Sequence, residues 1–136
     1  GGGGGGGGGS LYEDDAPLLV CAMHFVGSER KSVSPAAVAG KAGGVRSLAG
    51  GHGRLVVTSA RDPFAFGFGL KPAHPEGPHV SSLFGQVILT PAAYVDAVRS
   101  LSPDVWVALA DETVDDTSAK FQQRALERTA EWAGQC

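Results

Sequence analysis

The stretch from Gln86 to Gly134 restricts the possible fold more than any other part of this sequence. Two apolar segments alternate in it with two segments of helical periodicity, and the connections between them are only a few residues long. Such short β-α-β connections make the two strands parallel, with a crossover that is almost always right-handed. Because a parallel sheet needs helices on its faces, the sequence predicts an α/β fold, either a flavodoxin-like sheet or a β/α barrel.

The first helix of this stretch has recognisable start and stop residues. Thr90 is a good N-cap, and Pro91 suits the first helical position because the N–H that proline lacks would have no partner there. Ser102-Pro103 is expected to end the helix. Its predicted apolar stripe consists of Tyr94, Val95, Val98 and Leu101.

Residues 105–110, Val-Trp-Val-Ala-Leu-Ala, form an apolar run without alternation. This pattern is typical of a strand that is covered on both faces of a parallel sheet. A final helix is predicted to begin after Thr117 or Ser118 and to run to about Ala133, where Gly134 ends it. The residues expected on its buried face are Phe121, Ala125, Thr129 and Trp132.

The sequence before Gln86 is less regular. Apolar runs at residues 16–23 and 54–58 predict two more buried strands. Ser34-Pro35 is a plausible helix start, and the glycine-rich residues 50–53 are a plausible loop.

Residues 61–79 contain four of the eight prolines, which predicts a long surface loop. The next two segments, 79–83 and 86–90, are β-prone. They predict a hairpin in which Phe84-Gly85 forms the turn and the glycine adopts a positive φ.

Composition and charge exclude several classes of protein. The chain is 43% hydrophobic and 18% charged, and no apolar run approaches the roughly 18 residues of a membrane helix. A net charge of −3 gives no basic field that could bind a nucleic-acid backbone. Residues 1–10 are nine glycines and a serine, expected to be a flexible segment before a single domain at residues 11–136. Cys21 and Cys136 fit no metal or disulfide spacing and predict reduced, cytosolic thiols.

Asp111 and Glu112 are the strongest candidates for contact with a ligand. They directly follow the predicted strand 105–110, and in α/β folds ligands bind at the carboxyl ends of the strands. A carboxylate there can hydrogen-bond a polar ligand or act as a general base. Alternatively, these acids and Asp115-Asp116 only stabilise the N-terminus of the following helix through its dipole.

No metal site and no catalytic residue is expected in this chain. The histidines show no HxH or HExxH spacing, and no serine or cysteine has the sequence context of a catalytic nucleophile. The four histidines are His24, His52, His74 and His79.

The order of these features from Gln86 to Cys136 resembles one segment of the tRNA-guanine transglycosylase family. In that family a Ser/Thr-Pro helix leads through a Leu-(Gly/Ser/Gln)-x-Asp turn into a strand that ends in aspartate. A helix that ends in Arg-(Ser/Thr)-x-x-Trp follows, often with a cysteine soon after. The matching residues here are Thr90-Pro91, Leu101 to Asp104, Asp111, Arg128-Thr129, Trp132 and Cys136.

The resemblance implies a (β/α)8 barrel that recognises tRNA and exchanges guanine for queuine or a related deazaguanine. Asp111 is similar to the strand-end aspartate with which the family contacts the base, so it is the predicted substrate-binding residue. Thr113 stands where bacterial members often carry cysteine. The family's zinc site would lie beyond Cys136, so the resemblance implies no cofactor within this chain.

One departure from the family pattern favours its non-catalytic branch. Catalytic members carry a Thr-Asp-Ser-Gly-Gly-Phe motif shortly before the hairpin, whereas residues 61–79 lack it and contain only two acids, Asp62 and Glu76. A weaker likeness to the eukaryotic accessory subunit also covers residues 54–63 and 80–85. We therefore expect an accessory subunit of queuine tRNA-ribosyltransferase that is not catalytic alone. It would form a heterodimer with the catalytic subunit and reach tRNA through that complex, in the cytoplasm or at the mitochondrial surface.

The length of the chain agrees with an incomplete barrel. A complete TIM-type barrel takes about 250 residues, whereas this chain has 136, so we expect only the N-terminal units. An unclosed sheet edge would make such a piece marginally stable or prone to aggregation. Two alternatives remain open: a fragment of a catalytic transglycosylase or other TIM-barrel enzyme, and a small α/β binding module.

Overall fold

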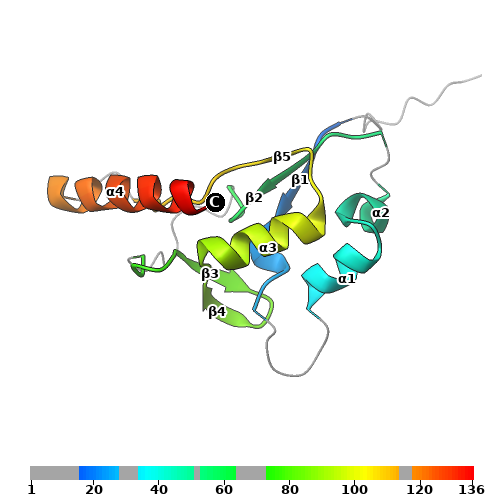
Figure 1. Ribbon diagram of the computed structural model, residues 1–136, viewed down its shortest axis with the longest axis horizontal. Helices are drawn as coiled ribbons and strands as arrows, with labels where there is room; N and C mark the ends of the chain where they lie inside the picture. Colours follow the sequence, from blue (N-terminus) through cyan, green and yellow to red (C-terminus); the bar gives the residue numbers. More distant parts are fainter. Residues whose placement is uncertain (1–15, 28–33, 51–52, 64–72, 114–117) are drawn as a thin grey trace, which may run out of the picture.

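The computed structural model describes residues 16–27, 34–50, 53–63, 73–113 and 118–136 (Figure 1). The polyglycine segment, His52, Thr117 and the central part of the predicted 61–79 loop lie outside these residues.

A three-stranded parallel sheet forms the centre of this part of the chain. Strands β1 (Leu18–Cys21), β2 (Val56–Ser59) and β5 (Val105–Trp106) lie in the order β1-β2-β5. The backbone of β2 pairs with β1 along its whole length and with β5 at Val57 and Thr58. The prediction of an α/β fold with a parallel sheet is therefore confirmed. The predicted parallel pair of strands 86–90 and 105–110 is wrong, because Gly85–Ile88 pairs antiparallel with His79–Ser82 in a separate two-stranded sheet.

The four α-helices of the described residues are α1 (Pro35–Lys41), α2 (Val45–Ala49), α3 (Pro91–Leu101) and α4 (Ala119–Gln135). Two begin as the sequence predicts. The Ser34 hydroxyl accepts a hydrogen bond from the Ala37 amide at 3.1 Å, and the Thr90 hydroxyl accepts one from Ala93 at 3.2 Å. Each cap leaves a proline at the first helical position, where no hydrogen bond is lost.

The end of α3 agrees with the prediction, whereas α4 differs from it in two details. Ser102 ends α3 in the left-handed conformation, with φ of 50°. Ser118 precedes α4, as expected, but its side chain makes no capping bond. Gly134 lies inside α4 instead of ending it, because glycine lowers helix propensity without preventing a helix.

Helices α1, α2 and α3 pack on the same face of the sheet. Val20 and Val56 of the strands form one buried cluster with Ala39, Val45 and Leu101 of the three helices. Because neighbouring residues of a strand point to opposite faces, the paired row Leu19, Val57 and Val105 lies on the other face. Leu19 and Val105 are exposed there.

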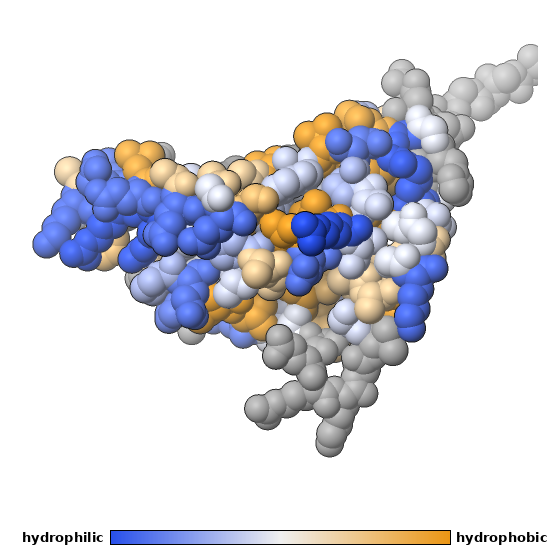
Figure 2. All heavy atoms as spheres, in the orientation of Figure 1, coloured by the Kyte–Doolittle hydropathy of each residue, from blue (hydrophilic) through white to orange (hydrophobic). Residues whose placement is uncertain are grey.

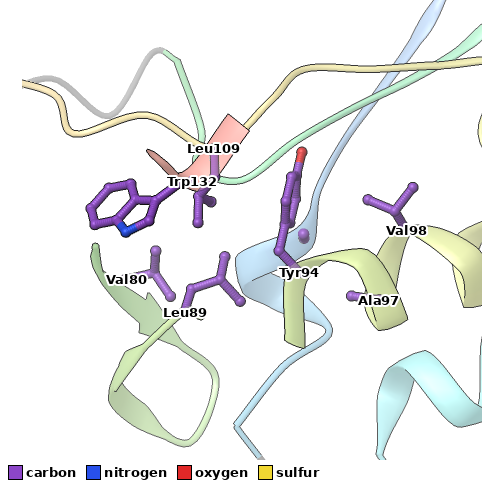
Figure 3. Close-up of a cluster of buried hydrophobic side chains, with 8 residues drawn as sticks. Val80, Leu89, Tyr94, Ala97, Val98, Leu109 and Trp132 are labelled. Atoms are coloured by element: carbon purple, nitrogen blue, oxygen red, sulfur yellow. The ribbon is translucent and has the colours of Figure 1, made fainter. Parts of the chain in front are cut away.

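A second buried cluster joins α3 to the hairpin and α4 (Figure 3). The hairpin consists of β3 (His79–Ser82) and β4 (Gly85–Ile88), and a 3-10 turn, η1 (Ala22–His24), follows β1. Trp132 of α4 is the largest buried side chain of the described residues. The other members of the cluster are Ala22, Val80, Leu89, Tyr94, Ala97, Val98 and Leu109.

The predicted strand 105–110 is wrong in length and in burial. Only Val105 and Trp106 form a strand, and Val107 is 54% exposed. The physical reason is that its only partner in the described sheet, β2, ends at Ser59, so pairing stops after the hydrogen bond from the Val107 amide to the Thr58 carbonyl. Leu109 alone is fully buried from this run, because it contacts the second cluster.

Three smaller predictions also need correction. The hairpin turn is Leu83-Phe84, and Gly85 opens β4 with φ of 110°. The strand predicted at 16–23 is shorter in the structure, where β1 covers Leu18–Cys21, and the strand predicted at 54–58 lies slightly later, as β2 at Val56–Ser59. Phe121 is 49% exposed because the N-terminal half of α4 extends away from the sheet (Figure 1), and much of the surface of α4 is hydrophilic (Figure 2).

Candidate functional site

The parallel direction of β1, β2 and β5 places their carboxyl ends at one edge of the sheet. This edge is where α/β proteins bind ligands. The residues at and beyond these strand ends are termed the carboxyl rim. They are Cys21, Ser59, Arg61, Asp62, Asp111 and Glu112.

Arg61 links the carboxyl rim to the hairpin. Its Nη2 donates a hydrogen bond to the His79 carbonyl at the start of β3, and its Nη1 lies 3.4 Å from Glu112 Oε2. The Ser59 hydroxyl donates to the carbonyl of Arg61 at 2.7 Å, which fixes the backbone after β2. Glu112 is 60% exposed, so its ion pair with Arg61 is long, open to solvent and weak.

Asp111 faces α4. Its Oδ2 accepts a hydrogen bond from Arg128 Nη1 at 3.1 Å, and its side chain is only 8% exposed. Its backbone amide donates to the Thr129 hydroxyl at 2.9 Å. The alternative interpretation placed this acid at the N-terminus of the following helix, but both contacts involve the C-terminal half of α4. The contact of Asp111 with a substrate stays a prediction.

Cys21, the last residue of β1, is paired with Ser59 of β2 and carries the thiol of the carboxyl rim. Burial raises the pKa of the Cys21 thiol above its ordinary value, the Ser59 hydroxyl at 4.0 Å opposes this shift, and the charge of Asp62 adds to it. A thiol with a raised pKa stays protonated at neutral pH and is a poor nucleophile. The geometry therefore gives Cys21 no activation.

Asp104, the aspartate of the Leu-x-x-Asp turn, lies at the opposite end of β5. Its Oδ2 accepts hydrogen bonds from the Val56 amide at 2.8 Å and from Arg46 Nη2, while its own amide donates to the Val56 carbonyl at 2.9 Å. The Val56 amide, and next Arg46, hold the pKa of this carboxyl below its ordinary value. Asp104 thus aligns β5 with β2, a stabilising role typical of the amino ends of parallel strands.

These motif residues are also those that the comparison with known families covers. The sequence profile of the queuine tRNA-ribosyltransferase family matches residues 30–136, well over half of the chain. The chain belongs to this family. A search of the curated proteins returned no match.

Membership in the queuine tRNA-ribosyltransferase family relates the chain to tRNA-guanine transglycosylation and so to tRNA modification. The match spans Asp104, Asp111 and the Arg128-Thr129-x-x-Trp132 pattern, whose contacts are described above.

Within the described residues, no group of three or more His, Cys, Asp or Glu side chains could hold a metal ion. No helix of that part of the chain is long and apolar enough to cross a membrane.

Sequence reasoning did not anticipate the pairing of Arg61 or of Arg128. The partners of Arg61 at His79 and Glu112 are 18 and 51 residues away, and no local pattern indicates such contacts. Arg128 belongs to the family pattern, but the pattern does not reveal that its partner is Asp111, 17 residues earlier.

Proposed function

We propose that this member of the queuine tRNA-ribosyltransferase family is a non-catalytic accessory subunit that supports the exchange of guanine for queuine in tRNA. The observation that carries the proposal is the sequence after β2. Ser59-Ala-Arg-Asp62-Pro63 begins the segment before the hairpin, and residues 61–79 lack the Thr-Asp-Ser-Gly-Gly-Phe motif of catalytic members. Arg61 in this segment is bound to His79 and Glu112.

The sheet is, in this proposal, the N-terminal part of a (β/α)8 barrel. Two observations support it: α1, α2 and α3 share one face of the parallel sheet, and apolar side chains such as Leu19 and Val105 are exposed on the other. A barrel has its helices outside and fills its interior with apolar side chains from the strands. The exposed row would then belong to the barrel interior.

The proposed partners follow from the same role. A catalytic transglycosylase subunit would form the heterodimer and supply most of the contacts to tRNA, because a chain with net charge −3 is poorly suited to bind phosphates alone. The complex would act in the cytoplasm or at the mitochondrial surface. The zinc site would belong to a part of the family fold beyond Cys136.

The test is co-expression of this chain with a catalytic queuine tRNA-ribosyltransferase subunit, followed by affinity purification and an assay for labelled guanine incorporation into tRNA. We expect co-purification, no incorporation by this chain alone, and incorporation by the complex. Incorporation by the chain alone, abolished by Asp111→Asn, would contradict the proposal and favour a catalytic fragment. Failure to co-purify would favour an independent α/β module.

A further inference from the structure

We infer that Arg128 is a positioning residue that locks Asp111 against α4, so that the strand-end acid anchors a helix and is withheld from ligands. The inference rests on the proposed accessory function. It gives Asp111 a role different from the predicted substrate contact, and an experiment can separate the two.

Arg128 binds two segments that are far apart in the sequence. Its Nη1 lies 3.1 Å from Asp111 Oδ2 and 3.3 Å from the carbonyl oxygen of Ala73. A guanidinium Nη carries two hydrogens, so the same nitrogen can serve both acceptors. One side chain of α4 therefore fixes the end of the β5 segment and the segment before β3.

Two neighbours of Arg128 on α4 strengthen this arrangement. Thr129 accepts the hydrogen bond of the Asp111 amide, so backbone and carboxylate of the same residue are both held by α4. Trp132, one turn later, donates from its indole nitrogen to the Pro75 carbonyl at 3.3 Å and is buried against Val80 and Leu109 (Figure 3). The Arg-Thr-x-x-Trp pattern is thus a three-point clamp.

Burial makes the clamp incompatible with easy ligand binding at Asp111. A ligand would have to displace Arg128 from a carboxylate that is 8% exposed, and would leave the guanidinium without its charged partner. Breaking a buried or half-buried ion pair in this way is costly. Glu112, the next residue, is 60% exposed and is much more accessible than Asp111.

The first experiment measures amide hydrogen exchange in the full chain and compares Arg128→Gln with Arg124→Gln. Arg124 is an exposed arginine one helical turn earlier in α4, which makes it a matched control. We expect Arg128→Gln to speed exchange by about tenfold in residues 73–77 and in the C-terminal half of α4, because bonds to charged groups are among the stronger ones. Arg124→Gln should leave both regions unchanged, and Arg128→Lys should recover part of the protection. Equal exchange in Arg128→Gln and wild type would overturn the inference.

The second experiment tests ligand contact directly, which a purely structural role would not affect. Guanine binding is measured by equilibrium dialysis with the wild-type chain, Asp111→Asn and Glu112→Gln. We expect no binding that depends on Asp111. If wild type binds guanine, Asp111→Asn does not and Glu112→Gln does, the inference that Arg128 withholds Asp111 from ligands is refuted. This holds even if the chain still co-purifies with a catalytic subunit. Conversely, base exchange by the chain alone would defeat the accessory function without changing the exchange result for Arg128.

Discussion

Replacing Gly77, which lies shortly before β3, with alanine should destabilise this protein more than the same change at Gly85 of β4 or Gly134 of α4. A Cβ at position 77 would lie 2.1 Å from the Leu89 carbonyl oxygen, 2.7 Å from the Leu89 carbonyl carbon and 3.1 Å from the Thr90 amide nitrogen. All three atoms belong to the backbone that leads into α3, so no side-chain rotation can relieve the contact. The adjacent hydrogen bond from the Leu89 amide to the Pro78 carbonyl, 2.9 Å long, holds the two segments together.

The magnitude follows from the size of the overlap. Carbon and oxygen atoms normally approach no closer than about 3.3 Å, so one segment must move by roughly 1 Å. Overpacking typically costs about 1–3 kcal/mol, and we expect the upper end because backbone must shift. A loss of about 3 kcal/mol reduces the folding equilibrium constant more than about hundredfold and lowers Tm by about 10 °C in a chain of this size.

Two other glycines provide matched controls in urea unfolding followed by tryptophan fluorescence. A Cβ at Gly134 meets no atom within 4 Å, so Gly134→Ala should stabilise α4 by about 0.5 kcal/mol. Gly85 is also in open space but has φ of 110°, so Gly85→Ala should cost about 1 kcal/mol through backbone strain alone. If the free energy of unfolding of Gly77→Ala lies within about 0.5 kcal/mol of the wild-type value, residues 73–78 do not pack against Leu89. The contacts of α4 with residues 73 and 75 would then be in doubt as well.

Three further substitutions test the packing and the pKa shifts. The pKa of Asp104 is lowered in the folded protein, so the ionised carboxylate stabilises the fold above about pH 4, and this stabilisation is lost as pH falls through the lowered pKa. The free energy of unfolding of Asp104→Asn should therefore decrease less than that of wild type on acidification. Burial, with a smaller effect of charge at Cys136, raises the pKa of Tyr94 to about 12. The free energy of unfolding should therefore fall as pH rises from about 10 towards 12. Tyr94→Phe should remove this fall, and should cost about 1 kcal/mol for the lost hydrogen bond to the Val107 carbonyl. The Thr58 hydroxyl is fully buried without a hydrogen-bond partner among the described residues. Thr58→Val should therefore raise the free energy of unfolding by about 1 kcal/mol in urea unfolding. A loss of stability in Thr58→Val would show that the hydroxyl has a hydrogen-bond partner.

The elements that sequence predicted well are those with local causes. Thr90-Pro91 and Ser34-Pro35 mark helix starts because the capping oxygen and the amide it binds are three residues apart. Tyr94, Val98 and Leu101 are buried as their spacing predicts. The α/β class was predicted correctly, but the short β-α-β unit from which it was inferred does not form, because β4 pairs with β3 while β1, β2 and β5 make the parallel sheet.

The failures have a common cause in contacts between distant segments. The run 105–110 has the composition of a covered strand, but its length as a strand depends on a neighbour that the sequence of the run does not specify. Phe121 lies on the predicted apolar face of α4, yet burial also requires a surface for that face to meet. Periodicity gives the face of a helix and not the partner that covers it.

The family membership could be predicted from the sequence, whereas the contacts within the candidate site could not. The sequence by itself determined the α/β class, the starts of α1 and α3 and the membership in the queuine tRNA-ribosyltransferase family. Only the tertiary structure decided that Asp111 is paired with Arg128 and that Asp104 binds Val56 and Arg46. Side-chain type fixes which interactions a residue can make, whereas the choice among possible partners depends on which distant segments the fold brings within hydrogen-bonding distance.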